Sequence, residues 1–181
     1  MIYLYLADGF EEVEALTPLD YLRRCKELAV MTVGVTGQQV RGAHDITVSC
    51  DLTPDQVRLS ETEMMILPGG MPGTNNLEQS DAVKATIDYC AKNDRWIAAI
   101  CAAPSILGHM GLLAGRSATC FPGYENELKG AHVTGQPVEI DGRLITARGA
   151  GVANQFAFAL IASLLGQNRA DELKAAIQWA E

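Results

Sequence analysis

Short, almost purely apolar runs recur along this chain, and helix-length amphipathic segments separate most of them. The runs occupy residues 2–7, 28–35, 64–67 and 96–100. Strands that are buried on both faces read as continuous apolar runs of this kind, whereas half-exposed strands alternate apolar and polar residues. The pattern therefore predicts an α/β fold with a mostly parallel central sheet that helices cover on both faces.

Helices are expected between and after these runs. The first is expected at residues 11–25, where apolar residues recur at helical spacing and Pro18 should kink or break the helix. Residues 137–147 read as a hairpin, because Asp141-Gly142 favours a type I′ turn. The chain has 181 residues and no linker-like segment, so one domain over residues 1–181 is expected. The other expected helices cover residues 81–93, 104–111, 152–165 and 170–179.

Charge and cysteine content argue against several classes of protein. The 22 Asp and Glu residues outnumber the 14 Lys and Arg residues without any basic block, so neither nucleic acid nor a membrane is expected as a partner. The first residues lack the basic segment of a signal peptide, and no apolar run reaches the roughly 18 residues of a membrane span. Five cysteines without a CxxC pair argue against a metal site. We expect reduced thiols, a cytoplasmic location and no cofactor.

Cys101 stands at the tightest predicted turn between a strand and a helix. The strand ends at Ile100 and Pro104 suits the first turn of a helix, so only three residues lie between them. So short a turn forces its first residue into a strained conformation and lifts the sulfur to the carboxyl edge of the sheet. The helix start is expected to lower the pKa of the Cys101 thiol. The alternative is an inert core cysteine, because free cysteine is among the most buried residue types.

Two further loops are expected at the same edge of the sheet. Gly69 and Gly70 follow one strand, and the N–H groups of Gly70 and Ala102 would form an oxyanion hole. Glu14 lies beside the apolar stripe of the first helix, a position that raises the pKa of a carboxyl and suits it to hydrogen-bond a Cys101 thiolate. Alternatively, the glycines form a plain turn, and Glu14 is a solvated complement to the helix dipole.

Four ordered motifs span almost the whole chain. They are Asp8-Gly9-Phe10-Glu11-Glu12-Val13-Glu14, Leu67-Pro68-Gly69-Gly70, Ala98-Ala99-Ile100-Cys101-Ala102-Ala103-Pro104 and Thr146-Ala147-Arg148-Gly149-Ala150-Gly151. Together they resemble the ThiJ/PfpI superfamily, in the branch of the Parkinson-disease-associated oxidative-stress protein. The resemblance implies a flavodoxin-like three-layer sandwich that forms a homodimer.

The resemblance also implies roles for individual residues. Cys101 matches the family's nucleophilic, oxidation-sensitive cysteine, and Glu14 matches the glutamate that hydrogen-bonds its sulfur and favours a sulfinate. Gly70 and Ala102 match the backbone donors beside that sulfur. Gly69 is a further candidate beside the site. Arg23 and Arg148 match positions in a polar network near the dimer interface. His44 lies in a hairpin at the dimer edge, and Cys120 lies in a segment near the pocket.

The chain departs from the family at two positions. Phe121 stands where members described as glyoxalases or deglycases often carry a histidine, and Ala102 stands where the peptidase-like branch carries one. No Cys-His nucleophile pair is therefore visible, and peptidase activity is not expected.

Three functions remain open. The first is an oxidative and carbonyl stress response in which peroxide oxidises Cys101 to sulfenic and then sulfinic acid. The second is a glutathione-independent glyoxalase or deglycase, a hydrolase or lyase that acts on methylglyoxal-type dicarbonyls and their adducts through Cys101 and Glu14. The third is a holdase chaperone without catalysis, in which Cys101 is only regulatory.

Overall fold

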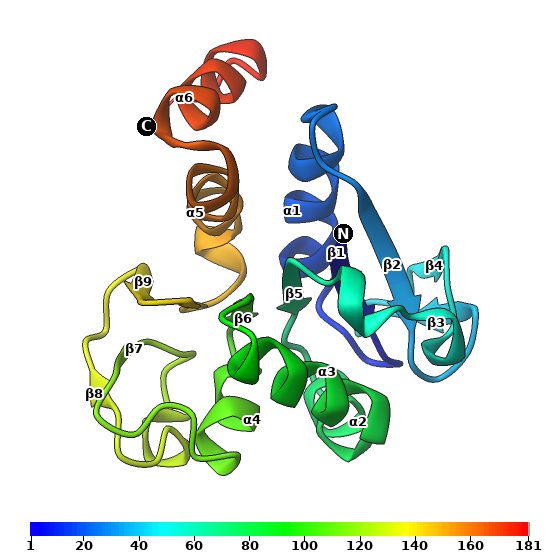
Figure 1. The fold of residues 1–181 in the computed structure, drawn as a ribbon, viewed down its shortest axis with the longest axis vertical. Helices are drawn as coiled ribbons and strands as arrows, with labels where there is room; N and C mark the ends of the chain where they lie inside the picture. Colours follow the sequence, from blue (N-terminus) through cyan, green and yellow to red (C-terminus); the bar gives the residue numbers. More distant parts are fainter. Residues whose placement is uncertain (181) are drawn as a thin grey trace.

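One six-stranded sheet organises the structure, a computed structural model that describes residues 1–180. The strand order is β2-β1-β5-β6-β10-β9, and of these six only β9 runs antiparallel to its neighbour (Figure 1). The prediction of a mostly parallel α/β sheet is confirmed. The strands are β1 (Ile2–Leu6), β2 (Val30–Gly34), β5 (Met64–Leu67), β6 (Trp96–Ile100), β9 (Val138–Asp141) and β10 (Leu144–Ala147).

Helices cover both faces of this sheet and give three layers (Figure 1). Alternate residues of β1 point to opposite faces: Leu4 lies in the hydrophobic cluster under α1, α5 and α6, and Tyr5 lies in the cluster under α2, α3 and α4. Continuous apolar strands are therefore needed to fill both clusters. The helices are α1 (Glu12–Arg24), α2 (Gly73–Gln79), α3 (Asp81–Lys92), α4 (Pro104–His109), α5 (Ala153–Leu165) and α6 (Gln167–Ala176).

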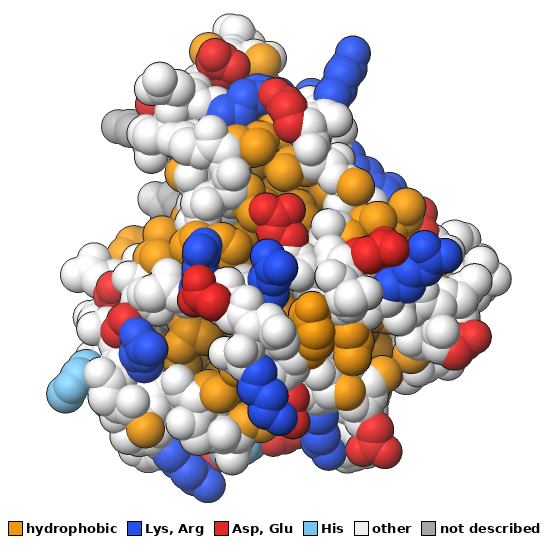
Figure 2. Space-filling view, viewed as in Figure 1, with side chains coloured by type: hydrophobic (Ala, Val, Ile, Leu, Met, Phe, Trp, Pro, Cys, Tyr) orange, Lys and Arg blue, Asp and Glu red, His pale blue; other side chains and the backbone are white. Residues whose placement is uncertain are grey.

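Smaller elements decorate the rim. The strands β3 (Gln39–Arg41) and β4 (Thr47–Ser49) form an antiparallel hairpin, and β7 (Ser117–Ala118) pairs in parallel with β8 (His132–Val133). The short 3₁₀ helices are η1 (Pro54–Gln56), η2 (Leu59–Glu61), η3 (Glu125–Glu127) and η4 (Ala150–Val152). No helix among residues 1–180 combines the length and the apolar character needed to cross a bilayer. On the face shown in Figure 2, acidic and basic side chains are interspersed rather than gathered by sign.

Several local predictions need correction. The helix α1 does not break at Pro18, which lies buried inside it, and α6 begins three residues before the predicted position. The predicted buried face of α1 is also wrong in part, because Val13 is 48% exposed whereas Glu12 and Glu14 are buried. The first turn of α1 thus directs two carboxyl groups inward.

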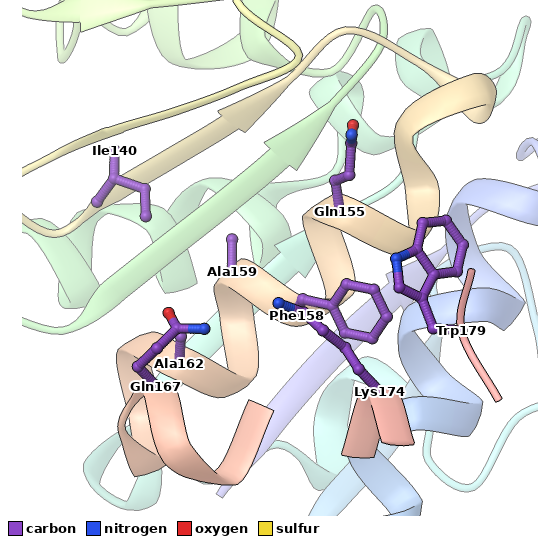
Figure 3. A pocket seen from close by; sticks show the side chains of 8 residues that line it. All are labelled: Ile140, Gln155, Phe158, Ala159, Ala162, Gln167, Lys174 and Trp179. Atoms are coloured by element: carbon purple, nitrogen blue, oxygen red, sulfur yellow. The ribbon is translucent and has the colours of Figure 1, made fainter. Parts of the chain in front are cut away.

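A cavity of about 620 Å³ lies between β9, α5 and α6 (Figure 3). Lys174 and Trp179 line it together with Phe158, whose ring stacks on Tyr21 with centroids 5.5 Å apart. These residues come from the C-terminal part of the chain and from β9, and none of the loops at the carboxyl edge of β1, β5 and β6 contributes to the cavity. The cavity is therefore separate from the predicted cysteine site.

His109 ties α4 to two neighbouring elements. Its Nδ1 lies 2.5 Å from Glu78 Oε1 in α2, and its Nε2 lies 2.8 Å from Glu127 Oε2 in η3. Hydrogen bonds to these two carboxylates raise the pKa of His109 in the folded protein. The positive charge is thus favoured more in the folded than in the unfolded chain, where the pKa of histidine is about 6.5.

We expect replacement of His109 by glutamine to lower the free energy of unfolding by roughly 1 kcal/mol at pH 5.5, because both charge-assisted bonds are lost. The stabilisation is fully present below the unfolded pKa and disappears as pH rises through the raised folded pKa, so the two proteins should converge near pH 9. Urea denaturation at both pH values measures this. A difference of the same size at both pH values would contradict it.

Candidate active site

The carboxyl ends of three adjacent strands bring the predicted loops together. The strands β1, β5 and β6 are neighbours in the sheet and run in parallel, so the segments after Leu6, Leu67 and Ile100 meet at one edge. The Glu11 N–H donates to the Gly69 carbonyl at 3.0 Å, which fastens the first loop to the second. The predicted convergence of these loops is observed.

Cys101 occupies a strained turn held from both sides. Its φ is +67°, in the left-handed region that side chains other than glycine rarely adopt. Its N–H donates to the Ala147 carbonyl at 2.9 Å, and its carbonyl accepts from the Phe121 N–H at 2.8 Å. These bonds keep the turn in place, and the helix α4 begins at Pro104 as predicted. The side chain is half-buried, whereas the other four cysteines are buried.

The Glu14 carboxyl reaches this cysteine from α1. The side chain is 1% exposed, and its Oε2 accepts from the Gly69 N–H at 2.9 Å. Burial is the main cause that raises the pKa of Glu14 from 4.5 to about 7, and the charge of Glu11 adds to it. Hydrogen bonds from Cys101 and from the N–H groups of Gly69 and Ala150 oppose that rise. Glu14 therefore gains or loses its proton near neutral pH.

The pKa of Cys101 differs from the sequence-based expectation. Burial first, and then the charge of Glu14 and the hydrogen bond with it, raise the pKa of the Cys101 thiol from 9.0 to about 12. The N–H groups of Ala102 and Gly70 act in the opposite direction and lower it. The expectation that the helix start would lower this pKa is wrong, because burial and the neighbouring carboxyl outweigh the N–H groups that lower it.

The two groups are best described as one titrating pair. The pair loses its first proton near pH 7 and its second only far above that pH. Between these limits the dominant arrangement has the remaining proton on the Cys101 sulfur and the negative charge on the Glu14 carboxyl. The arrangement with the proton on Glu14 leaves a thiolate that faces the N–H groups of Ala102 and Gly70. This is the arrangement that would make the sulfur a nucleophile.

Gly69 permits the close approach of the pair. A Cβ atom at this position would lie 2.6 Å from Cys101 Cβ and 2.7 Å from Glu14 Oε2, both far inside contact distance. Gly70 has a φ of +90°, and a Cβ there would lie 2.4 Å from the Glu11 nitrogen. Both glycines are therefore required by geometry.

Comparison with known proteins identifies the family of this chain. The sequence pattern of the DJ-1/PfpI family matches residues 1–163. The chain belongs to the DJ-1/PfpI family. It is 33% identical to protein dj-1beta of Drosophila melanogaster over 93% of this chain and 91% of that protein. It is also 28% identical to a deglycase of Pyrococcus abyssi over 81% of this chain and 89% of that protein.

Solved structures of the DJ-1 superfamily share the fold. A C103A mutant of a Salmonella typhimurium superfamily protein superposes with a TM-score of 0.93 at 33% identity, and the match covers 99% of this chain and 98% of that chain. The oxidised DJ-1 of Toxoplasma gondii gives a TM-score of 0.93 at 29% identity, with the same two coverages. The flavodoxin-like three-layer sandwich implied by the sequence resemblance is thus confirmed.

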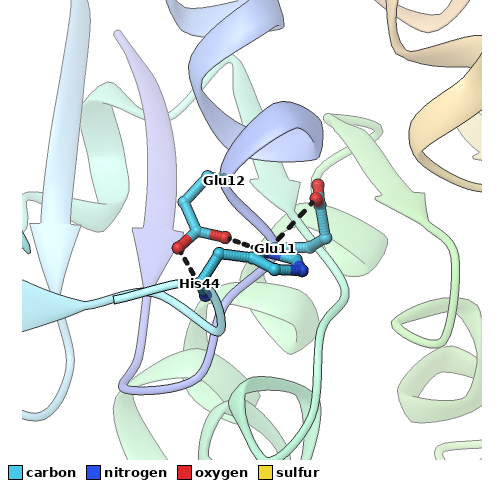
Figure 4. Close-up of side chains that lie close together, drawn as sticks. All are labelled: Glu11, Glu12 and His44. Carbon is cyan, nitrogen blue, oxygen red and sulfur yellow. Dashed lines mark hydrogen bonds and ion pairs between the residues drawn. The ribbon is translucent and has the colours of Figure 1, made fainter. Parts of the chain in front are cut away.

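In this DJ-1/PfpI member, Glu12 anchors the β3–β4 hairpin to α1. Its Oε1 accepts from the His44 N–H at 2.7 Å, and its Oε2 lies 2.7 Å from His44 Nδ1 (Figure 4). A Cβ at Gly42 would overlap this carboxyl, so the hairpin closes tightly over it. Glu11, Glu12 and His44 offer possible metal-ligand atoms within 4.8 Å of one another, but hydrogen bonds within the chain already engage Glu12. Within the single chain, His44 therefore bonds to Glu12.

The remaining candidates, Arg23, Cys120 and Arg148, lie in different parts of the fold. Arg23, near the C-terminal end of α1, pairs with Asp51 of the same chain. Cys120 belongs to the hydrophobic cluster under α3 and α4, whereas Cys101 packs against the cluster under α1 and α5. Arg148 is exposed and lines a shallow pocket beside Phe121. Among the residues described, all five cysteines are free thiols.

Sequence reasoning missed Glu12 as a structural residue. Acidic residues in a first helical turn usually complement the helix dipole from solvent, so nothing local distinguishes Glu12 from Glu11. Only the approach of Gly42 and His44, thirty residues away in the chain, shows why a carboxyl is buried there.

Proposed function

We propose that this protein is a cysteine-centred stress-response protein whose Cys101 reacts with small electrophiles, foremost peroxide. The observation that carries the proposal is the pair of Cys101 and Glu14, in which a carboxyl with a pKa of about 7 hydrogen-bonds to a sulfur that two backbone N–H groups also face. Family membership and the oxidised relative from Toxoplasma gondii support it. Cys101 and Glu14 carry the reaction, and Gly70 and Ala102 stabilise negative charge.

The proposed reaction begins when the thiolate attacks one oxygen of hydrogen peroxide. An S–O bond forms, the O–O bond breaks, and the second oxygen leaves as hydroxide, which takes up a proton and becomes water. Sulfur is oxidised to sulfenic acid while the peroxide is reduced. A second peroxide converts the sulfenic acid to sulfinic acid in the same way.

Mass spectrometry after mild peroxide treatment tests the proposal. We expect Cys101 to gain oxygen at least tenfold faster than Cys25 or Cys90, because Cys101 is only half-buried and hydrogen-bonds to Glu14, whereas Cys25 and Cys90 are buried. The matched controls are Cys90→Ser, which should leave Cys101 oxidation unchanged, and Cys101→Ser, which should abolish the fast phase. Equal oxidation of Cys101 and Cys90 would refute the proposal.

A second candidate is glyoxalase or deglycase chemistry on dicarbonyls, favoured by the Glu14 pKa of about 7 and by the deglycase from Pyrococcus abyssi. The thiolate would add to the aldehyde carbon of methylglyoxal, and Glu14 would protonate the new oxyanion to give a hemithioacetal. Glu14 would then move the proton between the two carbons before water releases lactate. Consumption of methylglyoxal that persists in Cys101→Ser would exclude this candidate. Unchanged suppression of aggregation by Cys101→Ala would instead favour the holdase alternative.

The partner we propose is a second copy of the chain. Val13 on α1 and Ile46 beside the β3–β4 hairpin are large apolar side chains that remain about half exposed in the single chain. Apolar groups gathered beside a functional site mark interaction surfaces. Sedimentation equilibrium of the wild-type protein decides between one and two copies.

A further inference from the structure

A shallow, largely apolar pocket adjoins the cysteine site. Its volume is about 370 Å³, within the range of small-molecule sites. The lining comes from the loop before η3, the segment that enters β9, and the loop after β10. These residues are Phe121, Pro122, Pro137, Arg148, Gly149, Ala150, Gly151 and Val152.

The wall of this pocket is also the wall of the reacting pair. The Ala150 N–H hydrogen-bonds to the Glu14 carboxyl, and the Phe121 N–H donates to the Cys101 carbonyl at 2.8 Å. A Cβ at Gly149 would lie 3.1 Å from the Phe121 ring and 3.7 Å from Glu14 Oε1. Gly149 is therefore the thin partition between the aromatic ring and the carboxyl. Phe121, Gly149 and Ala150 thus line the pocket and also contact the pair of Cys101 and Glu14.

Phe121 gives the pocket its chemical character. The Phe121 side chain is 47% exposed, so about half of this large apolar group is in contact with solvent. Prolines flank it in the pocket, and Arg148 is the only charged residue in the lining. The pocket therefore presents a mainly apolar surface beside the nucleophile. An apolar group that covers this surface removes it from water, which favours binding.

We propose that this pocket selects the electrophiles that Cys101 attacks, and that it favours those with an apolar alkyl or aryl substituent larger than methyl. The inference depends on the proposed reactivity of Cys101. It adds that the substituent lies on Phe121, Pro122 and Val152 while the electrophilic carbon meets the sulfur. Phe121 is thus a specificity-determining residue for the substituent.

Competing alkylation of Cys101 tests this selectivity. The probes are iodoacetamide and N-benzyl-iodoacetamide, which react alike: sulfur bonds to the methylene carbon, iodide leaves, and the thiol proton passes to Glu14 and then to solvent. Mass spectrometry gives the two rates at Cys101, and their ratio is divided by the same ratio for glutathione. We expect Cys101 to favour the benzyl probe by about tenfold relative to glutathione, since one ring face is removed from water.

Two variants locate the preference. Phe121→Ala removes the apolar wall and should reduce the preference to below threefold. Gly151→Leu should reduce it as well, because a Cβ there meets no atom within 4 Å and the rest of the side chain has room to cover the pocket that Gly151 lines. Val133→Ala, an apolar residue 40% exposed on β8, is the matched control and should retain the full preference.

The outcomes separate this inference from the function on which it depends. A ratio equal to that of glutathione overturns the apolar selectivity, whatever the absolute rate. A preference that persists in both Phe121→Ala and Gly151→Leu overturns the assignment to this pocket. Rates at Cys101 no faster than at Cys90 with either probe overturn the proposed reactivity itself.

Discussion

Replacing Glu14 with glutamine is expected to slow alkylation of Cys101 by iodoacetamide at pH 7 by about a hundredfold, the scale of general-base catalysis. In the wild type the rate should rise with a midpoint near pH 7, where the pair loses its first proton. Glutamine cannot accept that proton. The midpoint should then move above the ordinary thiol pKa, because burial is the largest cause that raises the pKa of Cys101. Alkylation rates measured from quenched samples between about pH 5 and about pH 10 give the pH profiles of the wild type and of Glu14→Gln.

Stability should change in the opposite direction. The folded pKa of Glu14 lies above its unfolded value, so the wild type loses stability as pH rises from about 4.5 to about 7. Glutamine carries no charge to bury, and the variant should be more stable than the wild type at pH 8 by roughly 2–3 kcal/mol.

Glu12→Gln is the matched control, because Glu12 is a buried carboxyl on the same helical turn that bonds to His44 instead of Cys101. Its alkylation midpoint should stay near pH 7. Equal midpoints for Glu14→Gln and the wild type would show that no proton is shared between Glu14 and Cys101.

Replacing Gly69 with alanine is expected to reduce the reactivity of Cys101 by at least tenfold and to lower the free energy of unfolding by about 1–3 kcal/mol. The added methyl group would lie 2.6 Å from Cys101 Cβ and 2.7 Å from Glu14 Oε2. It must therefore push the two groups apart, which breaks the shared hydrogen bond and distorts a buried site.

Gly151→Ala separates these effects from the general loss of a glycine. A Cβ at Gly151 meets nothing within 4 Å, so this control should keep both its stability and its reactivity toward iodoacetamide. Urea denaturation and the rate of iodoacetamide alkylation measure both variants. If Gly69→Ala matched Gly151→Ala in both measurements, the close packing at Gly69 would be irrelevant to the pair.

The sequence predicted the sheet well because buried parallel strands leave an unmistakable local pattern. Residues 64–67 and 96–100 are apolar throughout, and both are strands with those bounds. Cys101 was found from the same pattern, since a strand end and Pro104 leave room for only one kind of turn. Information within a few residues was sufficient for these features.

Features that depend on distant partners were not predictable in the same way. The outward direction of Val13 follows from the burial of Glu12 and Glu14 by Gly42, His44 and Gly69, none of which lies near them in the chain. The raised pKa of the Cys101 thiol likewise follows from its burial beside a carboxyl rather than from the helix start. Spacing along the chain carries no information about either environment.

The first turn of α1 presents its side chains in opposite directions. Glu14 points inward to the sulfur, whereas Val13 on the same turn points outward. Oxygen atoms added to Cys101 would have to fit against the Glu14 carboxyl and the closely packed Gly69. Oxidation of the Cys101 sulfur would thereby displace the first turn of α1, whose exposed side carries Val13 and is accessible to another molecule. The residue that contacts the modified sulfur, Glu14, and the residue that a partner could contact, Val13, are then adjacent in the chain.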